Sequence, residues 1–273
     1  MILSGIAASN DLYAKLPKFG DNLQLAALLI GNNPASQVYL RIKAKKLNEL
    51  GLGFRLINLA ANTPLEKILE EITKLNEDQN IKGIIIQLPL PETLIQHARK
   101  IINHIDPTKD VDCLHTQNLG SFYSGESDFM PATAQGVVDL LSYYNIDVAG
   151  KHAVIIGRSN LVSKPLAFAL LQKNATITIC HSYTKNLSNL TREADIVISA
   201  VGKPRFLTQS FFTEGQTVID IGINRDQNNT LCGDVDFETV SRIVAHITPV
   251  PGGVGPMTVY GLIKNLIRLA TNN

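Results

Sequence analysis

Residues 153–165 read Ala-Val-Ile-Ile-Gly-Arg-Ser-Asn-Leu-Val-Ser-Lys-Pro: a short apolar run, a glycine turn and the start of a helical pattern. The run 153–156 predicts a strand, and the following helix begins near Lys164. A strand, a glycine turn and a helix N-terminus together present backbone N–H groups to a phosphate. The turn is not G-x-G-x-x-G, so an ordinary strand–helix loop is the competing interpretation.

The same alternation of strand and helix continues through the second half of the chain. Further strands are predicted at 176–180, 195–200, 217–222 and 243–248. A helix over 131–144 joins the two halves. The last segment, 256–270, has apolar residues at helical spacing, and this helix could pack back on the first half.

The first half repeats the pattern. Strands are predicted at 23–30, 54–59 and 81–88. The helix after the first strand begins with Asn33 as N-cap and Pro34 at its first position, and it runs to about Leu50, where Gly51 stops it. Thr63-Pro64 opens the next helix in the same way.

Alternating strands and helices favour parallel sheets covered by helices. We therefore expect an α/β protein of two domains, an N-terminal α/β domain with a parallel sheet and a Rossmann-like nucleotide-binding domain, with a cleft between them. The expected boundaries are 1–134 plus 256–273 for the first domain and 135–255 for the second.

The composition is that of a globular protein with length for two modest domains: 273 residues, 45% hydrophobic and 18% charged. Because the net charge is +1 with no long run of one sign, nothing indicates nucleic acid or an anionic membrane surface. The apolar runs have strand length, and no secretory signal opens the chain, so we expect no membrane span and a cytoplasmic location. The cysteines suggest reduced thiols rather than a disulfide framework or a zinc site; they are Cys113, Cys180 and Cys232.

Tyr39 and Lys43 are four residues apart, which places both side chains on one face of the predicted helix. Such a pair more often forms a solvated flank than a site. Gln87 closes an apolar strand, at the end where ligands of open α/β sheets bind. A Gln that bonds only to loop backbone is an equally good interpretation.

Lys109-Asp110-Val111-Asp112 places two carboxylates at alternate positions. In an extended chain both point the same way, so one could reach a donor on a ligand. A solvated loop or a helix cap is the better interpretation from these residues alone.

The loop 249–258 contains three glycines and three prolines directly after a strand. This composition fixes an irregular path that lets backbone approach a flat ligand closely, although a domain-linking turn fits as well. Cys180-His181 has no acid nearby, so Cys180 is better explained as a core residue than as a nucleophile. No metal site is expected, because His97, His104 and His115 lack metal-ligand spacing.

Dinucleotide folds that prefer NAD commonly place an acid after the second strand, on the ribose hydroxyls. Here that position reads His181-Ser182-Tyr183-Thr184, without an acid. A hydroxyl at Ser182 and a cation at Arg158 suit a 2′-phosphate, which favours NADP.

Together these segments resemble the bifunctional methylenetetrahydrofolate dehydrogenase/methenyltetrahydrofolate cyclohydrolase family, also called the FolD family. The matching segments follow the family's order and spacing between about residues 23 and 270. They are Pro34-Ala35-Ser36-Gln37-Val38-Tyr39 with Lys43, Gln87-Leu88-Pro89-Leu90-Pro91, Lys109-Asp110-Val111-Asp112, Gly157-Arg158-Ser159, His181-Ser182 and Pro251-Gly252-Gly253-Val254-Gly255-Pro256-Met257-Thr258.

The resemblance implies a folate-binding catalytic domain, an NADP-binding domain and folate in the cleft. Under it Tyr39 stacks on the folate, Lys43 is the main catalytic residue, Gln87 hydrogen-bonds Lys43, and Asp112 binds the pterin ring. It also implies further substrate contacts from Pro251, Gly252 and Gly253. The NADP contacts it implies are Gly157, Arg158, Ser159, His181, Ser182 and Ile223.

The implied chemistry is oxidation of 5,10-methylenetetrahydrofolate to 5,10-methenyltetrahydrofolate with NADP, then hydrolysis to 10-formyltetrahydrofolate, in one-carbon metabolism and purine biosynthesis. The resemblance also suggests a homodimer formed through the nucleotide domains. Two other classes stay open: a shikimate- or amino-acid-type dehydrogenase of similar architecture, and a degenerate folate-binding scaffold.

The chain departs from the family pattern at a few positions. Cys113 stands where the family has Gly after Asp-Val-Asp, and Ser163 stands where its nucleotide loop has Gly. The family's Pro-Cys-Thr-Pro appears with Ala132 and Ala134. Ser163 could matter most for the cofactor, because a small residue there permits close packing of helix on strand.

Overall fold

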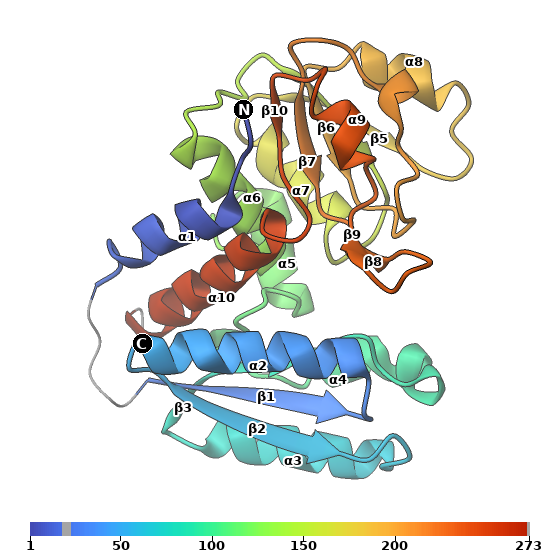
Figure 1. Ribbon diagram of the computed structural model, residues 1–273. Helices are drawn as coiled ribbons and strands as arrows, with labels where there is room; N and C mark the ends of the chain where they lie inside the picture. Colours follow the sequence, from blue (N-terminus) through green and yellow to red (C-terminus); the bar gives the residue numbers. More distant parts are fainter. Residues whose placement is uncertain (18–22, 272–273) are drawn as a thin grey trace. The chain divides into compact units, whose positions relative to one another are not determined.

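The computed structural model describes residues 1–17 and 23–271 (Figure 1). Residues 18–22 and 272–273, which fall in the expected first domain, lie outside the described residues. The chain forms two compact units, which we name by their sheets. The three-stranded unit is Leu16–Met130 with Leu262–Asn273, and the five-stranded unit is Met1–Lys15 with Pro131–Gly261.

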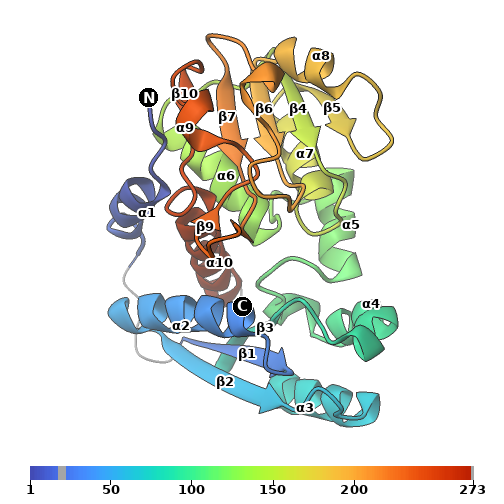
Figure 2. The same ribbon diagram turned by 45° about the vertical axis from the view of Figure 1, so that its right-hand side comes forward.

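The three-stranded unit is built around a parallel sheet of strand order β2-β1-β3. Its strands are β1 (Gln24–Ile30), β2 (Gly53–Leu59) and β3 (Ile81–Ile86). The crossover helices α2 (Pro34–Glu49) and α3 (Leu65–Glu77) lie on opposite faces of this sheet (Figures 1 and 2). The central strand is almost fully buried, as the apolar run in the sequence predicts.

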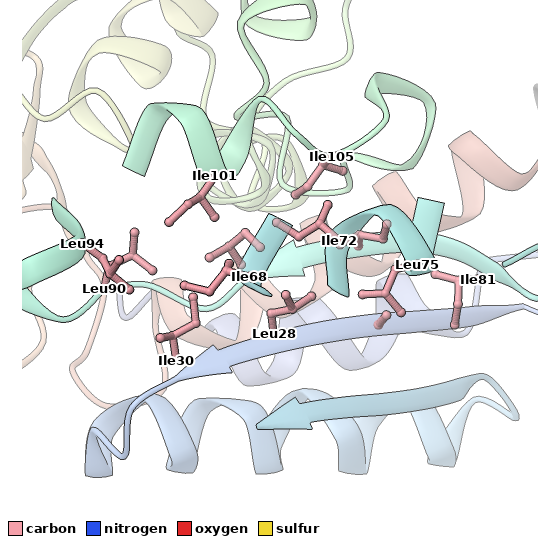
Figure 3. Packing of buried hydrophobic residues seen from close by; sticks show 13 residues of the cluster. Leu28, Ile30, Ile68, Ile72, Leu75, Ile81, Leu90, Leu94, Ile101 and Ile105 are labelled. Carbon is pink, nitrogen blue, oxygen red and sulfur yellow. The ribbon is translucent and has the colours of Figure 1, made fainter. Parts of the chain in front are cut away.

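One face of β1 and β3 packs on α3 and on the segment that follows β3. Figure 3 shows Leu28 and Ile30 of β1 against Ile68 and Ile72 of α3. Leu90, Leu94, Ile101 and Ile105 close the same cluster, from η1 (Glu92–His97), α4 (Ala98–Ile102) and the adjoining loops. Burying each such side chain contributes about 1.5–3 kcal/mol, so this cluster anchors the strand ends that carry the polar residues described below.

The five-stranded unit is a parallel sheet of order β10-β7-β6-β4-β5 (Figure 2). Its strands are β4 (His152–Ile156), β5 (Thr176–Cys180), β6 (Ile196–Ser199), β7 (Thr217–Asp220) and β10 (His246–Ile247). The chain goes from β4 to β5 on one side and then returns to β6 on the other. Strand order therefore reverses at β4, and a reversal of this kind is where doubly wound sheets bind nucleotides.

The remaining elements cover or connect the two sheets. The five-stranded unit contains α1 (Gly5–Tyr13), α6 (Ala132–Tyr143), α7 (Ser163–Leu171), α8 (Leu187–Arg192), η3 (Gln209–Phe211), α9 (Phe237–Val240) and the antiparallel pair β8 (Asn224–Arg225) and β9 (Leu231–Cys232). The three-stranded unit adds η2 (Pro107–Lys109) and α5 (Thr116–Ser124). The last helix, α10 (Val254–Thr271), contributes its first residues to one unit and its last to the other.

Helices α6 and α10 touch through their backbones. A Cβ on Gly136 would lie 2.4 Å from the carbonyl oxygen of Met257, and a Cβ on Gly261 would lie 2.3 Å from that of Ala132. Only glycine allows helices to approach this closely, so these two positions fix the spacing of the pair.

The N-terminal residues add to the edge of the five-stranded sheet. Leu3 N donates to Ile247 O at 2.8 Å, and Ile247 N donates to Met1 O at 3.1 Å. Residues 1–15 therefore group with the five-stranded unit, whereas the expected boundaries placed them in the first domain.

The α/β architecture with parallel sheets is confirmed, and most element ends shift by one or two residues. The predicted start of α3, with Thr63 as N-cap and Pro64 as first helical residue, was wrong. Pro64 is itself the N-cap, and no side chain caps this helix start. The predicted strand 243–248 shortens to the two residues of β10, because the residues before it form turns. Among the helices of the described residues, none is both long and apolar enough to cross a bilayer.

Candidate active site

Lys43 lies on the inner face of α2, and its side chain is only 7% exposed. The helix begins where the sequence indicated: the Asn33 side chain accepts a hydrogen bond from Ser36 N at 3.1 Å, and Pro34 is the first helical residue. Tyr39 lies one turn before Lys43 and is half-buried. Burial raises the pKa of the Tyr39 hydroxyl, so it stays protonated at neutral pH.

The side chain of Lys43 is hydrogen-bonded to Gln87, the residue that follows β3. Lys43 Nζ donates to Gln87 Oε1 at 3.1 Å. Gln87 N continues the sheet by donating to Leu28 O at 2.9 Å, and Gln87 Nε2 donates to Leu88 O at 2.8 Å. Because the amide nitrogen is already bonded, the amide oxygen faces Lys43, and the Gln87 side chain has a fixed orientation.

Burial and Asp112 act in opposite directions on Lys43. Burial lowers the pKa of Lys43, and the negative charge of Asp112 opposes that shift. Burial likewise raises the pKa of Asp112, while Lys43 lowers it. We conclude that the amine of Lys43 loses its proton more readily than an exposed lysine does.

Residues 111 and 112 form a turn and not extended chain, so the condition under which Asp110 and Asp112 would point the same way is not met. Asp110 is buried and holds its own loop: its carboxylate accepts from His115 N at 2.8 Å and from Asn118 Nδ2 at 2.9 Å. Lys109 is structural too, since its ammonium bonds three carbonyls at the end of α3, those of Leu75, Asn76 and Asp78. Asp112 is thus the carboxylate that acts on Lys43.

A buried asparagine of α10 fixes the loop that carries Asp112. Asn265 Nδ2 donates to Val111 O and to Met130 O, both at 3.0 Å. Asn265 was not among the site residues predicted from the sequence. The available signal was a polar residue inside the apolar face of a helix, which must find partners when buried.

In the five-stranded unit, Gly157 forms the turn between β4 and α7 with φ +140°. Ser159 holds the residues at the start of α7, because its Oγ accepts from Val162 N at 3.1 Å and from Ser163 N at 3.3 Å. Ser159 is exposed, and its hydroxyl proton is directed by neither of these bonds, so it can donate to an anion at the helix N-terminus. The turn therefore fits a dinucleotide phosphate.

The segment after β5 lies beside this turn, since Gly157 N donates to Cys180 O at 2.8 Å. Ser182 and Arg158 are both exposed. Cys180 is buried, and burial raises the pKa of its thiol, which disfavours a thiolate. All three cysteines are free and buried, as the absence of a disulfide pattern indicated.

The loop after β10 carries Pro251, Gly252 and Gly253 and is held by the start of α1. Ile6 N donates to Gly252 O at 3.2 Å, and Gly252 has φ +101°. Ile223 is 48% exposed and lies between β7 and β8. These four predicted contacts belong to the five-stranded unit, whereas Tyr39, Lys43, Gln87 and Asp112 come together in the three-stranded unit; their binding roles stay predictions.

Within the described ranges, no group of three or more His, Cys, Asp or Glu side chains could hold a metal ion. His115 caps α5 by accepting from Gln117 N at 3.1 Å, and His104 pairs with Thr73 at 2.9 Å. These histidines have structural partners.

Two family models match this chain almost end to end. The tetrahydrofolate dehydrogenase/cyclohydrolase catalytic domain matches residues 5–112, and the NAD(P)-binding domain of the same family matches residues 131–273.

The chain belongs to the tetrahydrofolate dehydrogenase/cyclohydrolase family. It is 48% identical to the bifunctional protein FolD of Halalkalibacterium halodurans, over 94% of this chain and 91% of that protein. The crystal structure of bifunctional FolD from Campylobacter jejuni has a TM-score of 0.94 and 42% identity, and covers 100% of this chain and 99% of that one. FolD of Trypanosoma brucei, complexed with NADP cofactor and an inhibitor, has a TM-score of 0.92 and 30% identity, over 100% and 97% of the chains. The expected family and fold class are confirmed.

Cys113, where the family usually has Gly, adopts a left-handed backbone with φ +55°. This conformation explains the family's preference, because a side chain there costs about 1–2 kcal/mol. The Cys113 side chain is fully buried, and its Sγ lies 3.4 Å from Phe129 O, which offsets part of that cost. Cys113 thus adopts the left-handed conformation that the turn after Asp112 requires.

Ala132 and Ala134 begin α6 after Pro131, and both are buried. Alanine is the best helix former and fits the close contact with α10, so these two departures favour the helix.

Ser163 is the first residue of α7 and is fully buried. Among the residues that the structure describes, none offers its Oγ a hydrogen bond, and this atom lies 2.6 Å from where a Cβ on Gly157 would stand. The hydroxyl therefore occupies the space between α7 and the glycine turn, which a glycine at position 163 would leave empty.

We expect Ser163→Ala to raise the free energy of unfolding by about 1–3 kcal/mol, because it removes a buried hydroxyl without a partner. Chemical denaturation measures the change. Ser210→Ala is the control, since the Ser210 hydroxyl is exposed and bonded to Thr208, and its loss should be near neutral. Equal effects of the two variants would contradict the prediction.

Two buried carboxylates, Asp220 and Asp234, hold the ends of β6 and β7; neither was predicted from the sequence. The Asp234 carboxylate accepts from Ser199 Oγ, Val201 N, Lys203 N and Asn224 Nδ2 at 2.7–2.9 Å. The Asp220 carboxylate accepts from Gly222 N, Asp234 N and Val235 N at 2.9–3.1 Å. Burial raises the pKa of Asp220 to about 7, although these three N–H groups favour its charged form. The two carboxylates set the path of the chain on both sides of Ile223.

Proposed function

We propose that this chain oxidises 5,10-methylenetetrahydrofolate to 5,10-methenyltetrahydrofolate with NADP and then hydrolyses the product to 10-formyltetrahydrofolate. The observation that carries the proposal is Lys43, a buried amine with a lowered pKa, aligned by Gln87 at 3.1 Å and placed one turn from Tyr39. The reaction needs a group of this kind, because water must lose a proton beside a substrate that is already a cation.

In the hydrolysis, water adds to the methenyl carbon and the neutral amine of Lys43 takes a proton from it. The bond from that carbon to N5 then breaks as N5 receives a proton, and one proton is released overall. A protonated Lys43 would be repelled by the methenyl cation, which together with burial favours the neutral amine. Tyr39 serves as the platform on which the folate stacks, and Asp112 binds the pterin.

The chemistry that NADP would supply here is acceptance of a hydride. Gly157, Ser159 and the N-terminus of α7 would hold its phosphates, with further contacts from His181 and Ile223. Arg158 and Ser182 would bind the 2′-phosphate, and residues 181–186 contain no acid that would repel it. Equal catalytic efficiency with NADP and NAD would contradict this assignment.

Asp112→Asn is expected to shift the acidic limb of the cyclohydrolase pH profile to lower pH. The carboxylate of Asp112 raises the pKa of Lys43, so its loss lets the amine become neutral at a lower pH. The measurement is kcat for methenyltetrahydrofolate hydrolysis against pH, at saturating substrate. A limb that stays in place would mean that Asp112 carries no charge beside Lys43.

One pair of assays tests the activity: formation of NADPH from methylenetetrahydrofolate, followed by decay of methenyltetrahydrofolate. A shikimate- or amino-acid-type dehydrogenase would give neither signal and would oxidise a small acid instead, with no use for Tyr39 or Gln87. A degenerate scaffold would bind folate without either signal. The bonded Lys43–Gln87 pair favours the enzyme over both alternatives.

We also propose that the chain forms a homodimer through the five-stranded unit and works in the cytoplasm. β5 is an edge strand of its sheet, and Ile179 of β5 and Leu171 of α7 are 40% and 52% exposed. Free buried thiols suit a reducing compartment. The mass of the protein in solution tests the dimer, and a monomer at micromolar concentration would contradict it.

A further inference from the structure

The side chain of Tyr183 is exposed to solvent although it is large and partly apolar. It is 78% exposed, the highest exposure among the large hydrophobic side chains of the described residues. It follows β5 by three positions, next to Ser182, and the proposed function gives it no role. Exposure of a single ring is ordinary, so what distinguishes Tyr183 is the set of contacts that its ring makes.

Three hydrogen bonds hold the backbone around Tyr183, although its side chain is not buried. Thr184 Oγ1 accepts from His181 N at 2.9 Å, and Thr184 N donates to His181 O at 2.8 Å. Tyr183 N donates to His181 Nδ1 at 3.2 Å. The rings of His181 and Tyr183 meet edge to face, with centroids 6.2 Å apart.

The ring contacts Arg158 across the glycine turn. The guanidinium carbon of Arg158 lies 5.5 Å from the centroid of the Tyr183 ring. Within residues 1–17 and 23–271, no carboxylate pairs with Arg158, so the Tyr183 ring is what orients this cation. A cation held over an aromatic face is attracted by the ring quadrupole.

This contact leaves the guanidinium free to bind an anion. The cation–π attraction depends on the charge of the guanidinium and occupies none of its N–H donors, which match the oxygens of a phosphate. The surroundings favour an anion as well, because residues 181–186 contain the hydroxyl of Ser182 and the cation of Lys185 but no acid.

We propose that Tyr183 is a positioning residue that orients Arg158 toward the 2′-phosphate and thereby sets the preference for NADP over NAD. The proposal rests on the proposed function, in which Arg158 and Ser182 bind that phosphate. Tyr183 acts through Arg158, so its contribution depends on the 2′-phosphate, which NAD lacks.

The test is the dissociation constant of each dinucleotide, measured by calorimetry on the intact protein without substrate. Tyr183→Ala should raise the constant for NADP about two- to five-fold and leave that for NAD unchanged. Tyr183→Phe keeps the ring and should behave as the unaltered protein. Because the side chain is exposed, both variants should fold, and thermal denaturation checks that they do.

A double-mutant cycle with Arg158→Ala decides whether Tyr183 acts through Arg158. In the Arg158→Ala background, Tyr183→Ala should have no further effect on NADP. Equal weakening of NADP and NAD, an additive loss in the cycle, or no effect of Tyr183→Ala would each overturn the proposal.

Arg158→Ala alone separates this inference from the proposed function. It should weaken NADP about ten-fold or more and spare NAD. If it does so while Tyr183→Ala changes nothing, the cofactor site stands and only the role of Tyr183 fails. If it spares NADP as well, the proposed 2′-phosphate site itself is wrong.

Discussion

Lys43→Met is expected to stop the hydrolysis of methenyltetrahydrofolate while oxidation of methylenetetrahydrofolate continues. Methionine matches the length of the lysine side chain but cannot take a proton from water. Removing a positioned acid–base group costs about 10²–10⁴-fold in rate, whereas hydride transfer moves no proton through this amine. Methenyltetrahydrofolate should therefore accumulate in an assay that starts from the methylene compound.

Lys45→Met is the matched control, because Lys45 lies on the same helix with its side chain 80% exposed. It should leave both reactions unchanged. Near-normal hydrolysis of methenyltetrahydrofolate by Lys43→Met would remove Lys43 from the mechanism.

Lys43→Met should also make the protein more stable at neutral pH. Burial lowers the pKa of Lys43 in the folded protein below that of the unfolded chain, so the unfolded chain binds more protons between the two values. The contribution of Lys43 to stability therefore rises with pH across that window. Lys43→Met should raise the free energy of unfolding below the window and remove this slope, so stability and catalysis oppose each other here.

Gly157→Ala is expected to abolish tight NADP binding. Its φ of +140° is open only to glycine, and the new Cβ would lie 2.6 Å from Ser163 Oγ and 2.7 Å from Ala200 O. The turn must move, which displaces Ser159 and the N-terminus of α7 from the phosphates. We expect the dissociation constant of NADP to rise at least about ten-fold, from lost charge-assisted hydrogen bonds, and the free energy of unfolding to fall by about 1–3 kcal/mol.

Gly150→Ala is the control that distinguishes the strain of a positive φ from the steric clash of a Cβ at position 157. Gly150 also has a positive φ, +72°, but nothing lies within 4 Å of where its Cβ would stand. This variant should lose stability and keep the affinity for NADP, measured by calorimetry. Unchanged NADP binding in Gly157→Ala would show that the turn does not hold the phosphates.

The parts of the site that could be predicted depend on local geometry. Tyr39 and Lys43 share a helix face because they are four apart, and Asn33-Pro34 fixes where that helix begins. Gln87 was found because a polar residue closing an apolar strand needs partners. The same rule would have found Asp220, which closes β7 in the same way.

The parts that could not be predicted depend on contacts between distant segments. Asp110 and Asp112 look equivalent in the sequence, but the turn at 111–112 separates them, and the bonds that hold it come from His115 and Asn118. The four donors around Asp234 come from positions 199 to 224, which no local pattern brings together. The spacing of residues along the chain carries no information about such convergence.

The backbone contact between α6 and α10 has a consequence for how this scaffold can be re-engineered. Gly136 and Gly261 leave no volume for even a methyl group, so a library that randomises them should return almost only the starting residue. Side chains that face ligands carry no such restriction. Selection for a new substrate or cofactor would therefore change the side chains that face the ligands, while Gly136 and Gly261 stay unchanged.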